Sequence, residues 1–166
     1  MNYIISANII ALTAAILMVY SGIIKKKSKI LFIQTIQCGL SIISNILLGG
    51  ISGAIINGVS CIRNILFYKN KLNTFIKIII SIITIIITIK FNNLKFIGLL
   101  PLISTLSYLW LMNTKNIIRF KLLIMFTMIL WAIYDFSIKS YTSTIFDIGT
   151  FITNFISIIQ IKYREK

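Results

Sequence analysis

The stretch NTFIKIIISIITIIITIKF, residues 73–91, decides how this chain folds. It is long enough to cross a lipid bilayer once as an α-helix, which takes roughly 20 apolar residues. Between its lysines the only polar side chains are those of Ser81, Thr84 and Thr88. In lipid a backbone must satisfy its own hydrogen bonds, so helix is the only plausible local state for this run. We therefore predict one membrane-spanning helix that carries no chemistry and links the segments on either side of it.

Six further apolar runs of similar length fill nearly all of the remaining chain. They lie at about 3–24, 29–48, 51–68, 96–113, 119–138 and 143–162, and Gly49 and Gly50 mark the turn between the second and third spans. The 166 residues are 58% hydrophobic, with a mean hydropathy of +0.96, which is too apolar for a soluble domain. The chain is therefore predicted to be an all-α integral membrane protein with seven transmembrane helices.

The basic residues gather on one side of the predicted membrane. Lysine and arginine are enriched in the cytoplasmic loops of membrane proteins, so this bias predicts an amino terminus outside the cell and a cytoplasmic carboxyl terminus. Six or eight spans would break the alternation. Thirteen basic residues follow the odd-numbered spans: Lys25, Lys26, Lys27, Lys29, Lys69, Lys71, Lys77, Lys115, Arg119, Lys121, Lys162, Arg164 and Lys166. Only Lys90, Lys95 and Lys139 fall on the opposite side.

Composition also narrows the chemistry. The net charge of +14 does not indicate nucleic acid as a partner, because the basic residues lie in short clusters between apolar runs. The chain has no histidine and only three acids, which excludes His-based metal sites and Ser-His or Cys-His nucleophiles. No nucleotide-binding motif is present. We expect no enzyme activity and no cofactor; the expected partners are the lipid bilayer and a small polar solute, and a homodimer is allowed.

The chain matches itself without gaps at an offset of 90 residues. Asn45 falls on Asp135, Asn57 on Asp147 and Asn64 on Asn154. These residue types are rare inside membranes, so their coincidence is harder to obtain by chance than a match between isoleucines. Four crossings separate the copies, so both copies point the same way. We predict a 3+1+3 arrangement of parallel repeats, with 1–70 as the first three-helix repeat, 71–94 as the inversion linker and 95–166 as the second repeat.

This plan resembles that of the SWEET and PQ-loop transporters, which are built from parallel repeats. More closely, three runs resemble the YgjV family of bacterial inner-membrane proteins: LLGGISGAIINGVSCIRNILFYK (47–69), GLLPLISTLSYLWLM (98–112) and MILWAIYDFSIKSYTSTIFDIGTFITNFISIIQI (128–161). The chain departs from SWEET transporters in keeping a single proline, Pro101, where that family typically has one in each of four helices. The resemblance implies a multi-pass protein of the bacterial cytoplasmic membrane and no settled biochemical activity.

Polar residues inside the predicted spans mark the candidate site. Asp147 and Asn154 are seven residues apart, so they share one helix face and differ by about 10 Å in depth. Asn57 and Asn64 repeat this spacing in span three. A charge at the bilayer centre costs about 2.5–3.5 kcal/mol, so these faces should turn inward, toward a common axis between spans three and seven. There they would line a cavity for a polar solute; alternatively, the asparagines join helices by hydrogen bonds.

Two acids and one arginine have competing interpretations. Asp147 is the expected proton site of a proton-linked carrier, or it forms a structural ion pair with Arg63, the only cation well inside a span. Asp135 pairs with Lys139 four residues later, or it belongs to an outer vestibule.

Trp131 and Pro101 complete the set of candidates. Trp131 and Tyr134 lie one turn apart beside Asp135, an arrangement that could stack a sugar or nucleoside ring. Pro101 either occupies the first turn of span five or kinks that span as a hinge.

Two functions of different classes fit these features. The first is a small-solute carrier, a facilitator or proton-linked, with a polar cavity between the two repeats. The alternative is a non-transporting membrane protein of the assembly or immunity type, which binds another membrane protein. A cavity lined by the polar residues of spans three and seven would favour the carrier, whereas polar groups closed off in mutual hydrogen bonds would favour the alternative.

Overall fold

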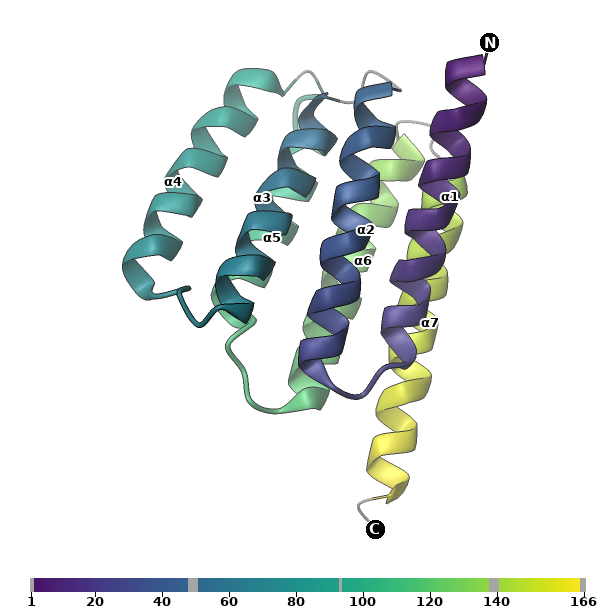
Figure 1. Cartoon of the computed structure of the whole chain (residues 1–166), viewed down its shortest axis with the longest axis vertical. Helices are drawn as coiled ribbons and strands as arrows, with labels where there is room; N and C mark the ends of the chain where they lie inside the picture. Colours follow the sequence, from purple (N-terminus) through teal and green to yellow (C-terminus); the bar gives the residue numbers. More distant parts are fainter. Residues whose placement is uncertain (1, 48–50, 93, 138–140, 165–166) are drawn as a thin grey trace.

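The computed structural model describes residues 2–47, 51–92, 94–137 and 141–164, and these form seven α-helices (Figure 1). The helices are α1 (Asn2–Ile23), α2 (Lys27–Leu47), α3 (Ile51–Tyr68), α4 (Thr74–Phe91), α5 (Leu100–Leu111), α6 (Ile117–Ser137) and α7 (Tyr141–Arg164). A 3₁₀ turn, η1 (Ile97–Leu99), leads into α5. The predicted spans are confirmed to within a few residues, and the predicted turn at Gly49 and Gly50 lies outside the described residues.

The fifth span is shorter than predicted. Six helices are long and apolar enough to cross a membrane, but η1 and α5 together form a shorter apolar helix, Ile97–Leu111. Lys95 and Phe96 instead lie in a turn, in which Asn92 Nδ2 donates to the Lys95 carbonyl at 2.8 Å and Lys95 has φ 52°. Pro101 follows in the first turn of α5, where its missing N–H removes no helical hydrogen bond.

Asparagines set several helix ends. The Asn73 side chain caps α4 by accepting from the backbone N–H of Ile76 at 2.8 Å, and Asn116 caps α6 by accepting from Ile118 at 2.8 Å. After α3, Asn70 takes a left-handed conformation with φ 55°. The N–H groups of Asn70 and Lys71 then bond back to Phe67 and Leu66, the pattern of a Schellman cap. These local signals explain why the spans begin and end where they do.

The helices form two layers, with α4 at one side. Figure 1 shows α1, α2 and α3 in front of α7, α6 and α5, and α4 outermost beside α3. Helix α1 packs against α2 and α7, α3 packs against α2, α4 and α5, and α6 packs against α5 and α7. The termini lie at opposite ends of the bundle (Figure 1). We call these the N-terminal end, where α1 begins, and the lysine-rich end, where α1, α3, α5 and α7 finish.

The predicted meeting of spans three and seven is not observed. The packing partners of α7 are α1 and α6, whereas those of α3 are α2, α4 and α5. The two helices stand at opposite corners of the bundle (Figure 1). The physical reason is that direct contact between the layers occurs at their edges, α1 on α7 and α3 on α5, so the space between the layers separates α3 from α7.

Small residues bring α1 close to its neighbours. A side chain added at Gly22 would collide with Thr153 and Asn154 of α7, and Thr153 Oγ1 donates to the Val19 carbonyl at 3.3 Å. On the other side, Ser44 Oγ of α2 donates to the Ala7 carbonyl at 3.0 Å. Membrane helices associate through this kind of close approach and interhelical hydrogen bonding.

An apolar cluster closes the lysine-rich end. It joins residues of α2, α5 and α6 with Leu72, and its buried members are Ile30, Leu31, Leu72, Tyr108, Leu109, Met112, Phe120, Leu123, Ile124 and Met128. Two lysines tie helices together there. Lys27 Nζ donates to the carbonyls of Met112 and Thr114, the latter at 2.9 Å, and Lys121 Nζ donates to the Gly22 carbonyl at 2.7 Å. Lysines placed on the last carbonyls of a helix are favoured by the helix dipole.

Candidate functional site

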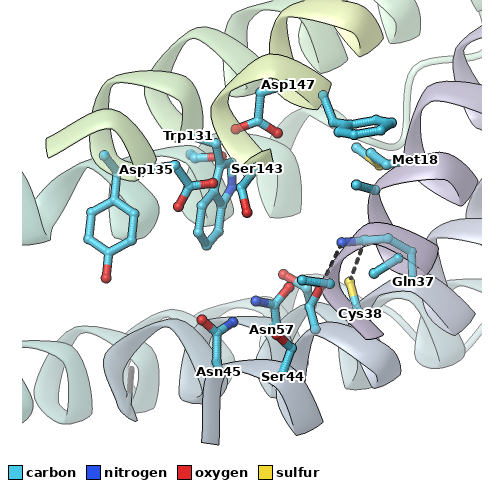
Figure 2. A pocket seen from close by; sticks show the side chains of 18 of the residues that line it. Met18, Gln37, Cys38, Ser44, Asn45, Asn57, Trp131, Asp135, Ser143 and Asp147 are labelled. Carbon is cyan, nitrogen blue, oxygen red and sulfur yellow. Dashed lines mark hydrogen bonds between the residues drawn. The ribbon is translucent and has the colours of Figure 1, made fainter. Parts of the chain in front are cut away.

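A cavity of about 740 Å³ lies between the two layers (Figure 2). Side chains of α1, α2, α3, α5, α6 and α7 line it, and α4 contributes only Phe91. Ligand sites in proteins typically measure ~300–1,000 Å³, so this space can hold a small solute.

The wall of the cavity is rich in polar groups. It includes carboxyl groups (Asp135, Asp147), a guanidinium (Arg63), amides (Asn8, Gln34, Gln37, Asn45, Asn57) and hydroxyls (Ser60, Ser104, Thr105, Tyr108). The outer surface of the bundle instead exposes mainly isoleucine, leucine and phenylalanine. Polar groups in a membrane bundle avoid the lipid face, and here these side chains face the cavity.

The cavity runs along the bundle and ends before the lysine-rich end. Near the N-terminal end its lining includes Asn45, Ser52 and the exposed Thr142, from the helix ends at that side. At the other extreme it reaches Gln34 and Tyr108, both buried. Tyr108 already belongs to the apolar cluster that closes the lysine-rich end. The lining therefore runs from helix ends at the N-terminal end to buried residues beside this apolar cluster.

Two of the three acids of the chain meet in this cavity. Asp135 near the end of α6 and Asp147 in the second turn of α7 lie within reach of a side-chain hydrogen bond, and Figure 2 shows both beside Ser143. Oδ2 of Asp147 is buried and has no hydrogen-bonding partner among the described residues. Two carboxyl groups can bond to each other only when one of them carries a proton, so a hydrogen bond within this pair requires a shared proton. The proposed partner of Asp135, Lys139, lies outside the described residues.

An amide pair occupies the opposite wall (Figure 2). Asn57 Nδ2 donates to the Gly53 carbonyl at 2.9 Å. The side chain of Asn45 lies over the same residue, since a Cβ added at Gly53 would be 3.1 Å from Asn45 Oδ1. At the offset of 90 residues, Asn45, Gly53 and Asn57 correspond to Asp135, Ser143 and Asp147. Asn45 and Asn57 thus line one wall of the cavity, and Asp135, Ser143 and Asp147 line the opposite wall.

Asn64 and Asn154 were predicted to line the same cavity, but they are not among its lining residues. Each is buried and accepts from a cation instead. Asn64 Oδ1 accepts from Arg63, and Asn154 Oδ1 accepts from Lys121 Nζ at 3.5 Å. Asn154 also donates to the Thr150 carbonyl at 2.8 Å. A buried cation needs polar acceptors, and each of these amide oxygens fills that role instead of facing the open volume.

Arg63 lines the deep part of the cavity and forms no ion pair with Asp147 among the described residues. Its guanidinium carbon lies 4.2 Å from the centroid of the Tyr108 ring. The structural ion pair offered as an alternative for Asp147 is therefore not formed, and the two charged groups belong to different parts of one cavity.

Trp131 lines the cavity, as predicted for a solute-binding residue. Its ring meets that of Tyr134 edge to face, with centroids 5.8 Å apart and planes at 90°, and Tyr134 Oη lies 3.3 Å from Ser52 Oγ of α3. The two rings do not form one flat platform. Pro101 lies in the first turn of α5, a position that gives it no kink to act as a hinge.

Several residues of the site were not singled out from the sequence. Tyr108 Oη donates to Gln34 Oε1 at 2.7 Å across 74 positions of sequence, and Lys121 is fully buried although it was counted among the loop cations. Gln34 carried a usable signal, because an amide inside an apolar span needs a partner. Lys121 carried none, since its partners, Gly22 and Asn154, come from other helices.

Comparison with known proteins identifies a family. The family model Imp-YgjV, described as a bacterial inner membrane protein, matches residues 5–165. No curated protein and no solved structure matches the chain.

Proposed function

The chain belongs to the Imp-YgjV family of bacterial inner-membrane proteins, and within that membrane we propose that it acts as a carrier for a small polar solute. The observation that carries this proposal is the polar cavity of about 740 Å³ between the layers, whose lining runs from exposed residues at the N-terminal end to buried residues beside the apolar cluster at the lysine-rich end. A carrier needs a central site that faces one side of the membrane at a time.

The proposed architecture is the 3+1+3 plan of parallel repeats, with the N-terminal end outside the cell. The isolated position of α4, beside α3 and α5 and nearly absent from the cavity, supports its role as an inversion linker. The matching residues on the two walls support the repeat. The excess of lysines beyond the closed end supports a cytoplasmic location for that end, so this state of the carrier would face outward.

Contacts at the lysine-rich end suggest how the site could change sides. Lys27 of the first repeat holds the Met112 carbonyl of the second, and Lys121 of the second holds the Gly22 carbonyl of the first. The two acceptors, Gly22 and Met112, are 90 positions apart, whereas the two lysines do not correspond at that offset. Rocking of one repeat against the other would break these bonds and open the cytoplasmic side, while the mouth near Ser52 and Tyr134 closes. The acid pair supports a proton-linked version of this cycle.

The alternative of a non-transporting protein that binds another membrane protein is less well supported. It would suit polar groups taken up in hydrogen bonds within the protein, and Asn154, which bonds to Lys121 and Thr150, fits this description. Asn57 and Asp147, however, line an open volume. The proposal is one of binding and transport, without an enzymatic step.

Cysteine accessibility tests the carrier without knowledge of the solute. Cys38 and Cys61 are replaced by alanine, and Ser60, in the cavity wall, is replaced by cysteine. A membrane-impermeant maleimide should label Ser60→Cys from the outside in intact cells and from the cytoplasmic side in inverted vesicles. Ile152→Cys, whose side chain is exposed on the outer surface, serves as the lipid-facing control and should remain unlabelled from both sides. Labelling of Ser60→Cys from one side only, with every solute mixture tried, would contradict the carrier.

A further inference from the structure

At the end of the cavity beside the apolar cluster, the guanidinium of Arg63 has no acidic partner among the described residues. Arg63 is 5% exposed, and its Nε and Nη2 atoms donate to Asn64 Oδ1 at 3.1 and 3.0 Å. Its other contact is the face of the Tyr108 ring. Both neighbours are neutral. Removing a cation from water costs free energy unless the cation is paired and fully hydrogen-bonded. A negative group beside Arg63 would therefore be stabilising.

A second group beside it also lacks a partner. Gln34 is 3% exposed and lines the cavity. Its Oε1 accepts from Tyr108 Oη at 2.7 Å, which orients the amide. Its Nε2 is buried and has no acceptor among the described residues. A buried donor without an acceptor costs about 1–3 kcal/mol. Gln34 and Arg63 therefore both offer hydrogen-bond donors to an acceptor at the same end of the cavity.

The acids of the cavity do not meet this demand. Asp147 lies six residues into α7 and Arg63 twelve residues into α3, so a rise of about 1.5 Å per residue places the carboxyl pair roughly 9 Å nearer the mouth. The hydroxyls of Ser60, Ser104 and Thr105 line the cavity as well. An oxyanion is the ligand that accepts from a guanidinium, an amide and hydroxyls together.

The second repeat does not reproduce this group of residues. At the offset of 90, Arg63 corresponds to Thr153, Gln34 to Ile124 and Tyr108 to Met18. A requirement of the shared three-helix scaffold would be expected in both copies. The three polar residues occur in one copy each and converge on a single place, which is the pattern of a binding site.

We propose that Arg63 and Gln34, held in place by Asn64 and Tyr108, form, at the end of the cavity beside the apolar cluster, an oxyanion site that binds the carboxylate or phosphate group of a small solute. This inference rests on the proposed carrier only in treating that solute as cargo. Binding itself is independent of transport.

Binding to the purified full-length protein in detergent tests the site. The probes are benzoate, with benzamide as its neutral match, and inorganic phosphate, with chloride at equal ionic strength. The readouts are the melting temperature, which rises with a ligand of the folded state, and the fluorescence of Trp131, which lines the cavity. Benzoate or phosphate should raise the melting temperature in a saturable way, whereas benzamide and chloride should not. No response to either anion, or an equal response to benzamide, overturns the proposal.

Variants assign the response to these residues. Arg63→Gln should weaken anion binding about 10-fold or more, because a charge-assisted bidentate contact is lost. Gln34→Glu keeps the acceptor for Tyr108 and nearly the same shape, but places a negative charge on the site, so it should abolish anion binding in a folded protein. Arg119→Gln removes an exposed arginine of α6 and should bind as wild type. Wild-type anion binding in folded Gln34→Glu overturns the proposal even if Arg63→Gln does not fold.

Transport in proteoliposomes separates the two proposals. Anion binding that depends on Arg63 and Gln34, without uptake of any bound anion, keeps the oxyanion site and contradicts the carrier. Uptake of a neutral solute by Gln34→Glu at the wild-type rate, with no anion bound by the wild-type protein, keeps the carrier and overturns the oxyanion site.

Discussion

At the scale of single residues, the main feature of the cavity is that its two acids, Asp135 and Asp147, lie close to each other. Their carboxyl groups are within reach of one hydrogen bond in a cavity bounded by apolar helices. Carboxyl groups this close titrate as a unit and share one proton. In the proposed carrier, this pair is the group that would release and take up a proton.

Infrared spectroscopy can detect the shared proton. Wild-type protein near neutral pH should show the C=O band of a protonated carboxylic acid. Asp135→Asn and Asp147→Asn should each lose this band, because an amide can donate to the remaining carboxylate without any proton being held. The third acid provides a control, and Glu165→Gln should leave the band unchanged. Persistence of the band in both aspartate variants would show that the proton lies elsewhere.

The asparagines divide into two kinds that the sequence does not distinguish. Asn57 lines the cavity and bonds only within its own helix turn, to Gly53. Asn154 is fully buried and joins α7 to Lys121 of α6. Lys121 in turn holds the end of α1 through Gly22. Asn154 therefore contributes to stability, whereas Asn57 is available to a solute.

Replacement of Asn154 should destabilise the protein. Asn154→Leu leaves the buried Lys121 ammonium with one acceptor fewer and should cost about 1–3 kcal/mol of unfolding free energy. Asn57→Leu should cost less. The double variant Asn154→Leu with Lys121→Met should be more stable than Asn154→Leu alone, because it removes both partners of the bond. Unfolding in detergent measures all three, and equal losses for Asn57→Leu and Asn154→Leu would contradict this division.

At the scale of helices, the crossing of α1 and α7 depends on the absence of a side chain at Gly22. Thr153 and Asn154 occupy the space that a Cβ would need. Gly39, in α2, has open space around it, with no atom within 4 Å of an added Cβ. The two glycines are both helical, so they form a natural comparison in which packing alone differs.

The two alanine variants should change stability in opposite directions. Gly22→Ala forces α1 away from α7 and should cost about 1–3 kcal/mol, as overpacking does. Gly39→Ala relieves only the intrinsic cost of glycine in a helix and should stabilise by about 0.5–1 kcal/mol. Thermal unfolding of both variants in the same detergent provides the measurement. A loss of stability in Gly39→Ala as large as that in Gly22→Ala would rule out packing as the cause.

Helix α5 is joined to α4 and to α2 by side-chain hydrogen bonds. Helix α4 packs only against α3 and α5 as major partners, and most of its isoleucines are exposed. Trp110 Nε1 of α5 donates to Ser81 Oγ of α4 at 3.2 Å, and this bond joins the two helices. Helix α5 is short, but it supplies Tyr108, which reaches Gln34.

At the scale of the whole molecule, different charged groups lie at different depths along the bundle. The lysine-rich end is closed by apolar packing and by lysines on helix carbonyls, the middle holds Arg63, and the acid pair lies nearer the opposite end. The proposed direction of transport depends on which of these ends faces the cytoplasm.

Topology reporters test the orientation. A green fluorescent protein fused after Lys166 should fluoresce, because this reporter folds in the cytoplasm, and an alkaline phosphatase fused at the same place should be inactive. A cysteine placed at the amino terminus should react with an impermeant maleimide added to intact cells. A dark fluorescent fusion together with an active phosphatase fusion would reverse the proposed direction.

The number and position of the helices followed from the sequence alone. The predicted spans match the helices to within a few residues, and Asn73 and Asn116 mark two of the starts. These features are local, because helix formation in lipid depends on the hydrogen bonds and hydrophobicity of one segment at a time. Of the candidates that the offset of 90 residues pointed to, Asn57 and Asp147 line the cavity, whereas Asn64 and Asn154 do not.

Only the tertiary structure decided which polar groups meet. Asn64 follows Asn57 by seven residues, and Asn154 follows Asp147 by seven. Each of these two asparagines accepts a hydrogen bond from a buried cation, and neither lines the cavity. Gln34 meets Tyr108 across 74 residues, and Lys121 meets Gly22 across 99. Such partners depend on the depth and rotation of whole helices, which are set by packing between surfaces far apart in the chain. An amide in an apolar run shows that it needs a partner; the packed bundle determines which partner it has.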